Sequence, residues 1–430
     1  MNLLVITVCC LLASICSLHF LPFHPIVSYT VTFISASIIF LILAYLLFKR
    51  ELSNNAVIVI ILAAIAVRVL FITTMPIGSD DIYRYLWDGK VQSSAINPYA
   101  YAPKSEELKH LSTQQIPSMV NQPEMKTIYF PLSEWIFYLS YKISGEHVWG
   151  IKVLLLISEI CTLYGLFFLT TLLGIPRKFI LFYALCPMIF YEYAIDAHID
   201  GFGLPLLVFS LYLYLDKKKL WSMILLGFSF SIKPTGLVLL PIFFFFEKDW
   251  KLRFQIVLIP LLTLAFQFAP YFISANPFDA LSVFSKNWTF NGFVFNVLDS
   301  YFHYNQKSRL ICAILLGIIV LLLAFSKKQL IDKIYYALLF LLLFSPIVHP
   351  WYVGWLAVML PISRRWSGLV FVSTLSLTSF TYISYQLHGV WREEPIFWII
   401  EYVPVVVLLI LELWNDYSVP VVLPLEGESE

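Results

Sequence analysis

A group of charged side chains stands directly after the third long apolar segment of a chain that is only 13% charged. It begins with the adjacent carboxylates Asp80 and Asp81, and Arg84, Asp88 and Lys90 follow. Ionised groups at the end of a membrane segment are costly to place and often mark a functional site. A carboxylate that faces a cleft at the membrane surface is a candidate general base. The group therefore predicts acid–base chemistry, with an ordinary cap and salt-bridge cluster as the alternative.

These side chains are expected to lie on a short helix. Ser79 is a suitable N-cap for it, because a serine hydroxyl accepts the first free amides of a helix. The helical period then places four side chains on one face, at spacings i, i+3, i+4 and i+7: Asp81, Arg84, Tyr85 and Asp88. The first carboxylate of the adjacent pair would stand in the first turn, where the helix dipole keeps it ionised.

A second polar cluster, which includes Glu192, His198 and Asp200, ends another apolar segment. Apolar helices rarely end in several ionisable groups without a ligand, so we expect these three side chains to bind substrate. A solvated loop is the alternative. Histidine and carboxylates together also suit a metal ion, but their spacing matches no established metal motif, and we expect no metal.

Single polar residues mark two further apolar segments and one loop. Lys233 interrupts the apolar stretch 220–246, and its ammonium is expensive there unless it meets an anion such as a lipid phosphate. Snorkelling to the headgroups is the alternative. His349 is a second candidate donor to a phosphate oxygen, or a purely structural histidine. Asn291 lies among amides and aromatic rings, which suit sugar hydroxyls and ring faces.

The elements that position these residues are membrane helices. The chain has 430 residues, 60% of them hydrophobic, with a mean hydropathy of +0.82, which indicates an all-α polytopic membrane protein. A span needs roughly 20 apolar residues. We expect about 12–14 transmembrane or re-entrant helices: 3–22, 26–48, 55–75, 148–173, 179–194, 201–215, a hairpin over 220–246, 254–273, 308–325, 333–347, 350–362, 367–387 and 396–414.

Other features narrow the class of protein. The first segment resembles a signal peptide but lacks a basic start, so we expect a first transmembrane helix. A net charge of +1 gives no case for nucleic-acid binding. The six cysteines lie in apolar runs without metal-ligand spacing, so buried thiols are expected instead of a disulfide framework. Within the membrane we expect Arg68 and Glu159 to form a structural ion pair.

Short basic loops predict the orientation of the chain. They all fall on one side when the N-terminus is cytoplasmic and 14 segments are counted: 49–50, 177–178, 217–219, 248–253, 327–333 and 364–365. The opposite, outer side receives the segments with unusual polar residues: 76–147, 195–200, Lys233, 274–307, His349 and 388–395. We expect residues 1–415 to form one membrane domain and 416–430 a short cytoplasmic tail. Within the long loop, Pro131 is expected to start a surface helix.

Several of these segments resemble a known family. Residues 80–89, followed by 97–99, are similar to the first periplasmic loop of bacterial GT-C glycosyltransferases. The nearest similarity is to the mannosyltransferase-like group that uses a polyprenyl-phosphate sugar donor. Residues 197–201, 232–234 and 349–352 resemble further family patterns, in the expected order. One departure is Tyr-Phe-Pro at the start of the surface helix, where relatives often carry Tyr-Pro-Pro.

The resemblance implies a GT-C-like helical bundle that needs no cofactor and transfers one sugar, usually mannose, with inversion. The donor would be a polyprenyl-phosphate sugar, and the acceptor a glycan, a lipid or a protein. The implied location is the bacterial inner membrane, with the site facing the periplasm or the cell exterior among membrane lipids. Either Asp80 or Asp81 would be the base. Arg84, Lys233 and His349 would bind the donor phosphate, and the substrate-binding set would be Tyr85, Asp88, Glu192, His198, Asp200 and Asn291.

Two other classes of protein remain open at this point. A transporter or flippase for a lipid-linked glycan would also place charged groups in a membrane cavity, but near the midplane and on both faces. The polar groups of this chain crowd one face, and no internal repeat is visible, which favours an enzyme. A non-catalytic scaffold of a glycan assembly complex predicts that changing Asp80 and Asp81 has no effect.

Overall fold

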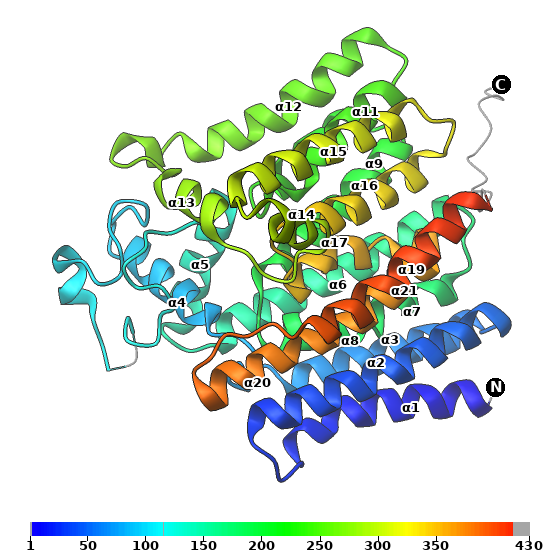
Figure 1. Ribbon diagram of the computed structural model, residues 1–430, viewed down its shortest axis with the longest axis horizontal. Coiled ribbons are helices and arrows are strands. Elements are labelled where there is room, and N and C mark those ends of the chain that lie inside the picture. The colour runs from blue at the N-terminus through cyan, green and yellow to red at the C-terminus, as the bar shows by residue number, and fades with distance from the viewer. Residues whose placement is uncertain (1, 115, 416–430) are drawn as a thin grey trace.

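The computed structural model describes residues 2–114 and 116–415, and this part of the chain is a bundle of helices (Figure 1). Within these residues the extended structure is a single isolated bridge between Phe290 and Ile347, and no strand forms. The all-α architecture expected from the composition is therefore confirmed. The predicted cytoplasmic tail, 416–430, lies outside the described residues.

Helices of membrane-spanning character run through the whole described chain. By length and composition, six can cross a membrane: α2 (Pro25–Lys49), α6 (Trp149–Leu172), α12 (Trp250–Phe268), α15 (Asn305–Phe325), the run Trp366–His388 formed by α19 (Trp366–Thr374) and α20 (Ser379–His388), and α21 (Pro395–Trp414). Shorter apolar helices lie among them: α1 (Asn2–Cys16), α3 (Asn54–Leu70), α9 (Gly203–Leu215), α10 (Lys219–Phe230), α11 (Leu240–Phe246) and α16 (Leu330–Phe344). The chain is a polytopic membrane protein.

Two segments that were expected to be single helices are broken. The first consists of α7 (Leu181–Ala184), α8 (Pro187–Ile189) and a π-helix over Phe190–Ile195, and it bends by 49°. The second consists of a 3-10 turn over Pro350–Val353, α17 (Gly354–Ala357) and α18 (Leu360–Ser363). Each break coincides with a proline, which lacks the amide that would continue the helix. The first broken segment ends at the polar end of the bundle, and the second begins there.

Small residues allow neighbouring helices to approach closely. A Cβ on Gly165 of α6 would lie 2.9 Å from Val208 of α9. A Cβ on Gly227 of α10 would lie 2.7 Å from the carbonyl oxygen of Pro260 in α12. Without a hydrophobic driving force between helices in lipid, such close backbone packing is a main source of their association. The contacts α6–α9–α10–α12 therefore form one continuous layer.

The basic loops meet at one end of the bundle. Lys178 donates to the carbonyl oxygen of Arg50 at 2.8 Å, and the Arg364 guanidinium lies 5.3 Å from the Phe179 ring centre. The start of α1 and the end of α21 lie at this end, on the right of Figure 1. The opposite end carries α4 (Asp81–Ser93), α5 (Pro131–Ser144), α13 (Asp279–Asn287) and the start of α14 (Phe293–Phe302). The expected separation of basic loops from unusual polar segments is thus present along the long direction of the bundle.

Two local expectations are also met. The helix expected at Pro131 is α5, which begins at that residue and packs against α4 and α6. Arg68 and Glu159 form the expected ion pair, and both side chains are buried. The first apolar segment of the chain also forms a helix, α1, which packs along α2 within the bundle.

Candidate active site

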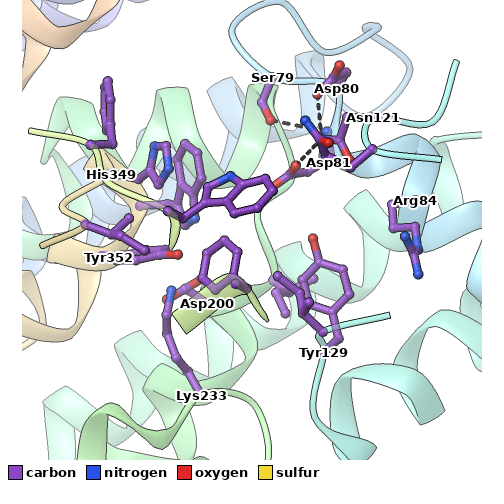
Figure 2. A pocket seen from close by; sticks show the side chains of 18 of the residues that line it. Ser79, Asp80, Asp81, Arg84, Asn121, Tyr129, Asp200, Lys233, His349 and Tyr352 are labelled. Carbon is purple, nitrogen blue, oxygen red and sulfur yellow. Dashed lines mark hydrogen bonds and ion pairs between the residues drawn. The ribbon is translucent and has the colours of Figure 1, made fainter. Parts of the chain in front are cut away.

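A cavity of about 1130 Å³ opens at the end of the bundle opposite the basic loops. Every segment expected on the outer side contributes to its lining, and residues from the end of α16 and from α20 complete it: 76–85, 121–130, 199–200, 232–235, 281–290, 341–352 and 382–391. Seven of the eleven candidate residues thus converge from distant parts of the sequence on one space (Figure 2): Asp80, Asp81, Arg84, Tyr85, Asp200, Lys233 and His349. Among the described residues, no group of three or more His, Cys, Asp or Glu side chains is arranged to hold a metal ion.

The adjacent carboxylates stand at the start of α4, at the wall of this cavity. The helix begins at Asp81, one residue later than expected, with Asp80 at the N-cap position. Ser79 is therefore not the N-cap, and Asp80 makes no capping hydrogen bond with its side chain. The Ser79 hydroxyl accepts the amide of Asp81 at 3.2 Å from the position before the cap. Asp80 is exposed to the cavity, whereas the Asp81 side chain is only 22% exposed.

Asn121 holds the two carboxylates together. Its side-chain nitrogen donates to Asp80 Oδ1 at 2.8 Å and to Asp81 Oδ1 at 2.7 Å (Figure 2). Asn121 lies about forty positions away in an irregular loop and was not among the residues predicted from the sequence. Its only local signal is the turn-forming run Asn-Gln-Pro. The amide leaves each carboxylate a second oxygen, so both groups keep an acceptor for a substrate hydroxyl.

The surroundings favour a protonatable Asp81. Loss of water around this side chain raises the pKa of its carboxyl group above the usual range, and the neighbouring Asp80 raises it further. His198 and the Asn121 hydrogen bond act in the opposite direction. His198 Nε2 lies 4.0 Å from Asp81 Oδ2 and has no hydrogen-bond partner among the described residues. A carboxylate with a raised pKa is a better proton acceptor, which suits a general base.

Lys233 lies across the cavity at the break between α10 and a 3-10 turn over Pro234–Leu239. Its Nζ is 2.9 Å from Asp200 Oδ1 and 2.8 Å from the centre of the Tyr352 ring (Figure 2). Trp355 donates to the same Asp200 oxygen at 2.8 Å. Burial lowers the pKa of Lys233 to about 8. The lysine is therefore held by a carboxylate and a ring face, and its side chain stays 21% exposed.

Four nearly parallel rings form one wall of the cavity, and we call them the aromatic column. The ring centres of His198 and Trp351 are 3.6 Å apart, those of Trp351 and His349 are 4.2 Å apart, and those of His349 and Phe290 are 4.4 Å apart. Three of the rings line the cavity, and His198 is buried behind them. His349 Nδ1 has no hydrogen-bond partner among the described residues. Because Trp351 and His349 are each stacked between two other rings, these two rings present their edges to the cavity.

Arg84 lines the cavity, but its charge is already paired. Its Nε donates to both carboxylate oxygens of Asp88, at 2.9 and 2.8 Å, and Nη1 donates to the Met125 carbonyl at 2.9 Å. Asp88 is buried and lies outside the cavity lining. Tyr85 lines the cavity and stacks on Phe137, with ring centres 4.6 Å apart. The four residues expected on one face of α4 do share that face, but Arg84, Tyr85 and Asp88 make contacts within the protein instead of standing free in the cavity.

Four of the six expected substrate-binding residues do not line the cavity: Asp88, Glu192, His198 and Asn291. Glu192 is fully buried and accepts the Tyr29 hydroxyl at 3.4 Å. Asn291 binds the C-terminal part of the chain, because its side chain donates to Glu401 and its backbone amide donates to Glu393, each at 2.7 Å. The structure thus places Glu192 and Asn291 behind the cavity wall.

An apolar helical bundle that gathers carboxylates, a lysine and stacked rings around one cavity is the architecture of a membrane-embedded enzyme. A family model described as alpha-(1->6)-mannopyranosyltransferase, N-terminal domain, matches residues 11–247, more than half of the chain. The chain belongs to this family, and the protein is a membrane glycosyltransferase. No curated protein and no solved structure matches the chain. The matched part holds Asp80, Asp81 and Lys233, whereas most of the aromatic column lies beyond it.

Proposed function

We propose that the protein transfers one mannose from a polyprenyl-phosphate donor to a glycan, lipid or protein acceptor, with inversion, on the non-cytoplasmic face of the membrane. The observation that carries this proposal is the single cavity in which Asp80 and Asp81 face Lys233 beside a wall of stacked rings. A lipid phosphate needs a cation and an apolar surround, and a sugar acceptor needs a base and an apolar wall. Both sets of groups are supplied within this cavity.

Asp81 is the proposed general base. Burial raises the pKa of both carboxyl groups and Asn121 fixes one oxygen of each. Asp81 is the more enclosed of the two, and its other oxygen lies 4.0 Å from His198 Nε2. The acceptor hydroxyl gives its proton to the free oxygen of Asp81 while the hydroxyl oxygen bonds to the sugar C1 carbon. The bond from C1 to the phosphate oxygen breaks on the opposite side, and polyprenyl phosphate leaves with the electron pair. Asp80 orients Asn121 and the acceptor.

Lys233 is the proposed partner of the leaving phosphate, on whose oxygens negative charge increases during transfer. Its ammonium has two further donor positions beyond the bond to Asp200. His349, with an unpartnered Nδ1 on the same side, is the second proposed donor. The positive charge of Arg84 also favours an anion in the cavity, but its Nε already donates to Asp88 and is not free for the phosphate.

The test of this function is transfer from a defined donor. Purified protein in lipid vesicles is supplied with radiolabelled polyprenyl-phosphate mannose and membrane-extracted acceptors, and the labelled product is counted. We expect transfer from this donor and none from a nucleotide-linked mannose. Transfer from the nucleotide-linked sugar alone would overturn the proposed donor, and no transfer from either would overturn the proposed reaction.

The proposed orientation predicts which residues an impermeant thiol reagent reaches in intact cells. In a variant without native cysteines, Glu107→Cys should be labelled from outside, and Lys218→Cys should be labelled only after the membrane is opened. Both positions are exposed: Glu107 lies in a 3-10 turn of the long segment 76–147, and Lys218 lies in the turn between α9 and α10. The reverse pattern of labelling would place the cavity on the cytoplasmic face.

The two groups that surround Asp81 predict opposite shifts in the pH dependence of transfer. A base acts when deprotonated, so activity falls as the pH drops through its pKa. Asn121→Ala removes a hydrogen bond that lowers the pKa of Asp81, so the acidic limb of kcat/KM should move to higher pH. Asp80→Asn removes a negative charge that raises this pKa, so the limb should move to lower pH. Shifts in the same direction, or no shifts, would contradict the role of Asp81.

A further inference from the structure

The connector between α3 and α4 is held by a buried carboxylate that does not touch the cavity. Asp196 Oδ1 accepts two successive backbone amides, from Ile77 at 2.7 Å and from Gly78 at 2.9 Å. Its other oxygen accepts the Tyr29 hydroxyl at 2.8 Å. Asp196 is 1% exposed and is absent from the cavity lining. A charged acceptor that takes two amides makes stronger hydrogen bonds than a neutral one.

A buried lysine holds the earlier half of the same connector. Lys152 Nζ donates to the carbonyl oxygens of Phe71 and Thr74, and also to that of Ile195, directly before Asp196. Three carbonyl partners use all three donors of an ammonium group, so this lysine has none left for a ligand. The cation therefore binds the carbonyls of the connector and the neighbouring carboxylate binds its amides.

Gly78 lets the connector come this close to Asp196. A Cβ at this position would lie 2.5 Å from Asp196 Oδ2 and 3.0 Å from the Tyr29 ring. With any larger residue, either the backbone of the connector or the Asp196 carboxylate must move, and the contact between them changes. The connector continues directly into Ser79, Asp80 and Asp81, so a displacement at Gly78 passes to the proposed base within three residues.

We propose that Asp196 is a positioning residue for sugar transfer, which sets the place of Asp80 and Asp81 by fixing the backbone of residues 77–78. This inference rests on the proposed role of the carboxylate pair. Catalysis by a general base depends on its distance from the acceptor hydroxyl, and a misplacement of about 1 Å can lower a rate by about 100-fold. Asp196 reaches the reaction only through the backbone that it holds.

Three variants test this positioning role. Asp196→Ala should lower kcat on the order of 100-fold and leave the donor KM within roughly twofold, because the cavity walls that bind donor are unchanged. Asp196→Asn should recover kcat to within about tenfold of the wild type, since its amide oxygen accepts the same two backbone bonds. Gly78→Ala should match Asp196→Ala without removing a charge. Thr73→Ala, at an exposed position of the same connector, is the matched control.

Hydrogen exchange of the connector gives a reading that does not depend on catalysis. The amides of Ile77 and Gly78 should exchange faster in Asp196→Ala and Gly78→Ala, and at nearly the wild-type rate in Asp196→Asn. Faster exchange with unchanged kcat, or equal loss of kcat in the Asn and Ala variants, would overturn the positioning role. Normal transfer by both Asp80→Asn and Asp81→Asn would instead overturn the proposed base, whatever the exchange rates show.

Discussion

Asp81→Asn is expected to slow mannosyl transfer by about 100- to 10,000-fold while the protein still binds its donor. Asparagine has the size of aspartate and keeps an oxygen for the Asn121 amide, but it cannot take a proton from the acceptor hydroxyl. The loss should therefore appear in the single-turnover rate and not in donor affinity. Rapid mixing with radiolabelled polyprenyl-phosphate mannose gives the rate, and equilibrium binding of the same donor gives the affinity.

Two comparisons make this experiment decisive. Glu124→Gln removes a carboxylate of the same long loop that pairs with Lys104 at the surface, and it should leave transfer unchanged. Asp80→Asn should lose less activity than Asp81→Asn. If Asp80→Asn is the more damaging change, the base is Asp80. Near-normal turnover in both variants would remove the carboxylate pair from the chemistry.

Lys233→Met should weaken donor binding on the order of 10- to 100-fold, because a hydrogen bond to a charged group contributes about 1.5–3 kcal/mol. The methionine keeps the apolar stem beside Tyr352 but removes the ammonium. Lys233→Arg should restore part of the affinity, since a planar guanidinium fits a site for a point charge imperfectly. Donor affinity and transfer rate are measured in all variants, with Lys104→Met as the exposed control.

The partner of Lys233 needs a control of its own. Lys233→Met leaves Asp200 buried without its cation, which destabilises the fold for reasons unrelated to the donor. The double variant Lys233→Met/Asp200→Asn removes both charges, and Trp355 can still donate to the amide oxygen. We expect this stable double variant to remain defective in donor binding. Normal donor affinity in it would show that Lys233 serves only to hold Asp200.

Much of the bundle was predictable from the sequence because apolar length alone identifies a membrane span. α2, α6, α15 and α21 begin and end within about three residues of the expected bounds. The breaks at Pro187 and Pro361 were not predicted, although both prolines are visible. A proline inside an apolar run either kinks one helix or divides it, and the packing of neighbouring helices decides between these outcomes.

The candidate site was predictable where it depends on the ends of apolar segments. Asp80, Asp81, Lys233 and His349 each end such a segment, and one orientation of the chain brings them to the same end. Asn121 lies in an irregular loop, and only tertiary packing brings it to the carboxylates.

Asn291 shows the opposite case. Its position among amides and aromatic residues indicates a sugar contact, yet its bonds to Glu393 and Glu401 turn it away from the cavity. Those partners are more than a hundred residues later in the chain, and no local pattern predicts such a pairing.

The residues that line the cavity come from two stretches of the chain, one inside the family match and one after it. The family match ends at residue 247, so the proposed base and Lys233 lie inside the matched stretch. Phe290, His349 and Trp351 come from the remainder, and only His198 joins the column from the matched stretch. Mutations after residue 247 can therefore reshape the aromatic column, and with it the proposed phosphate donor His349, while the proposed base and Lys233 stay unchanged.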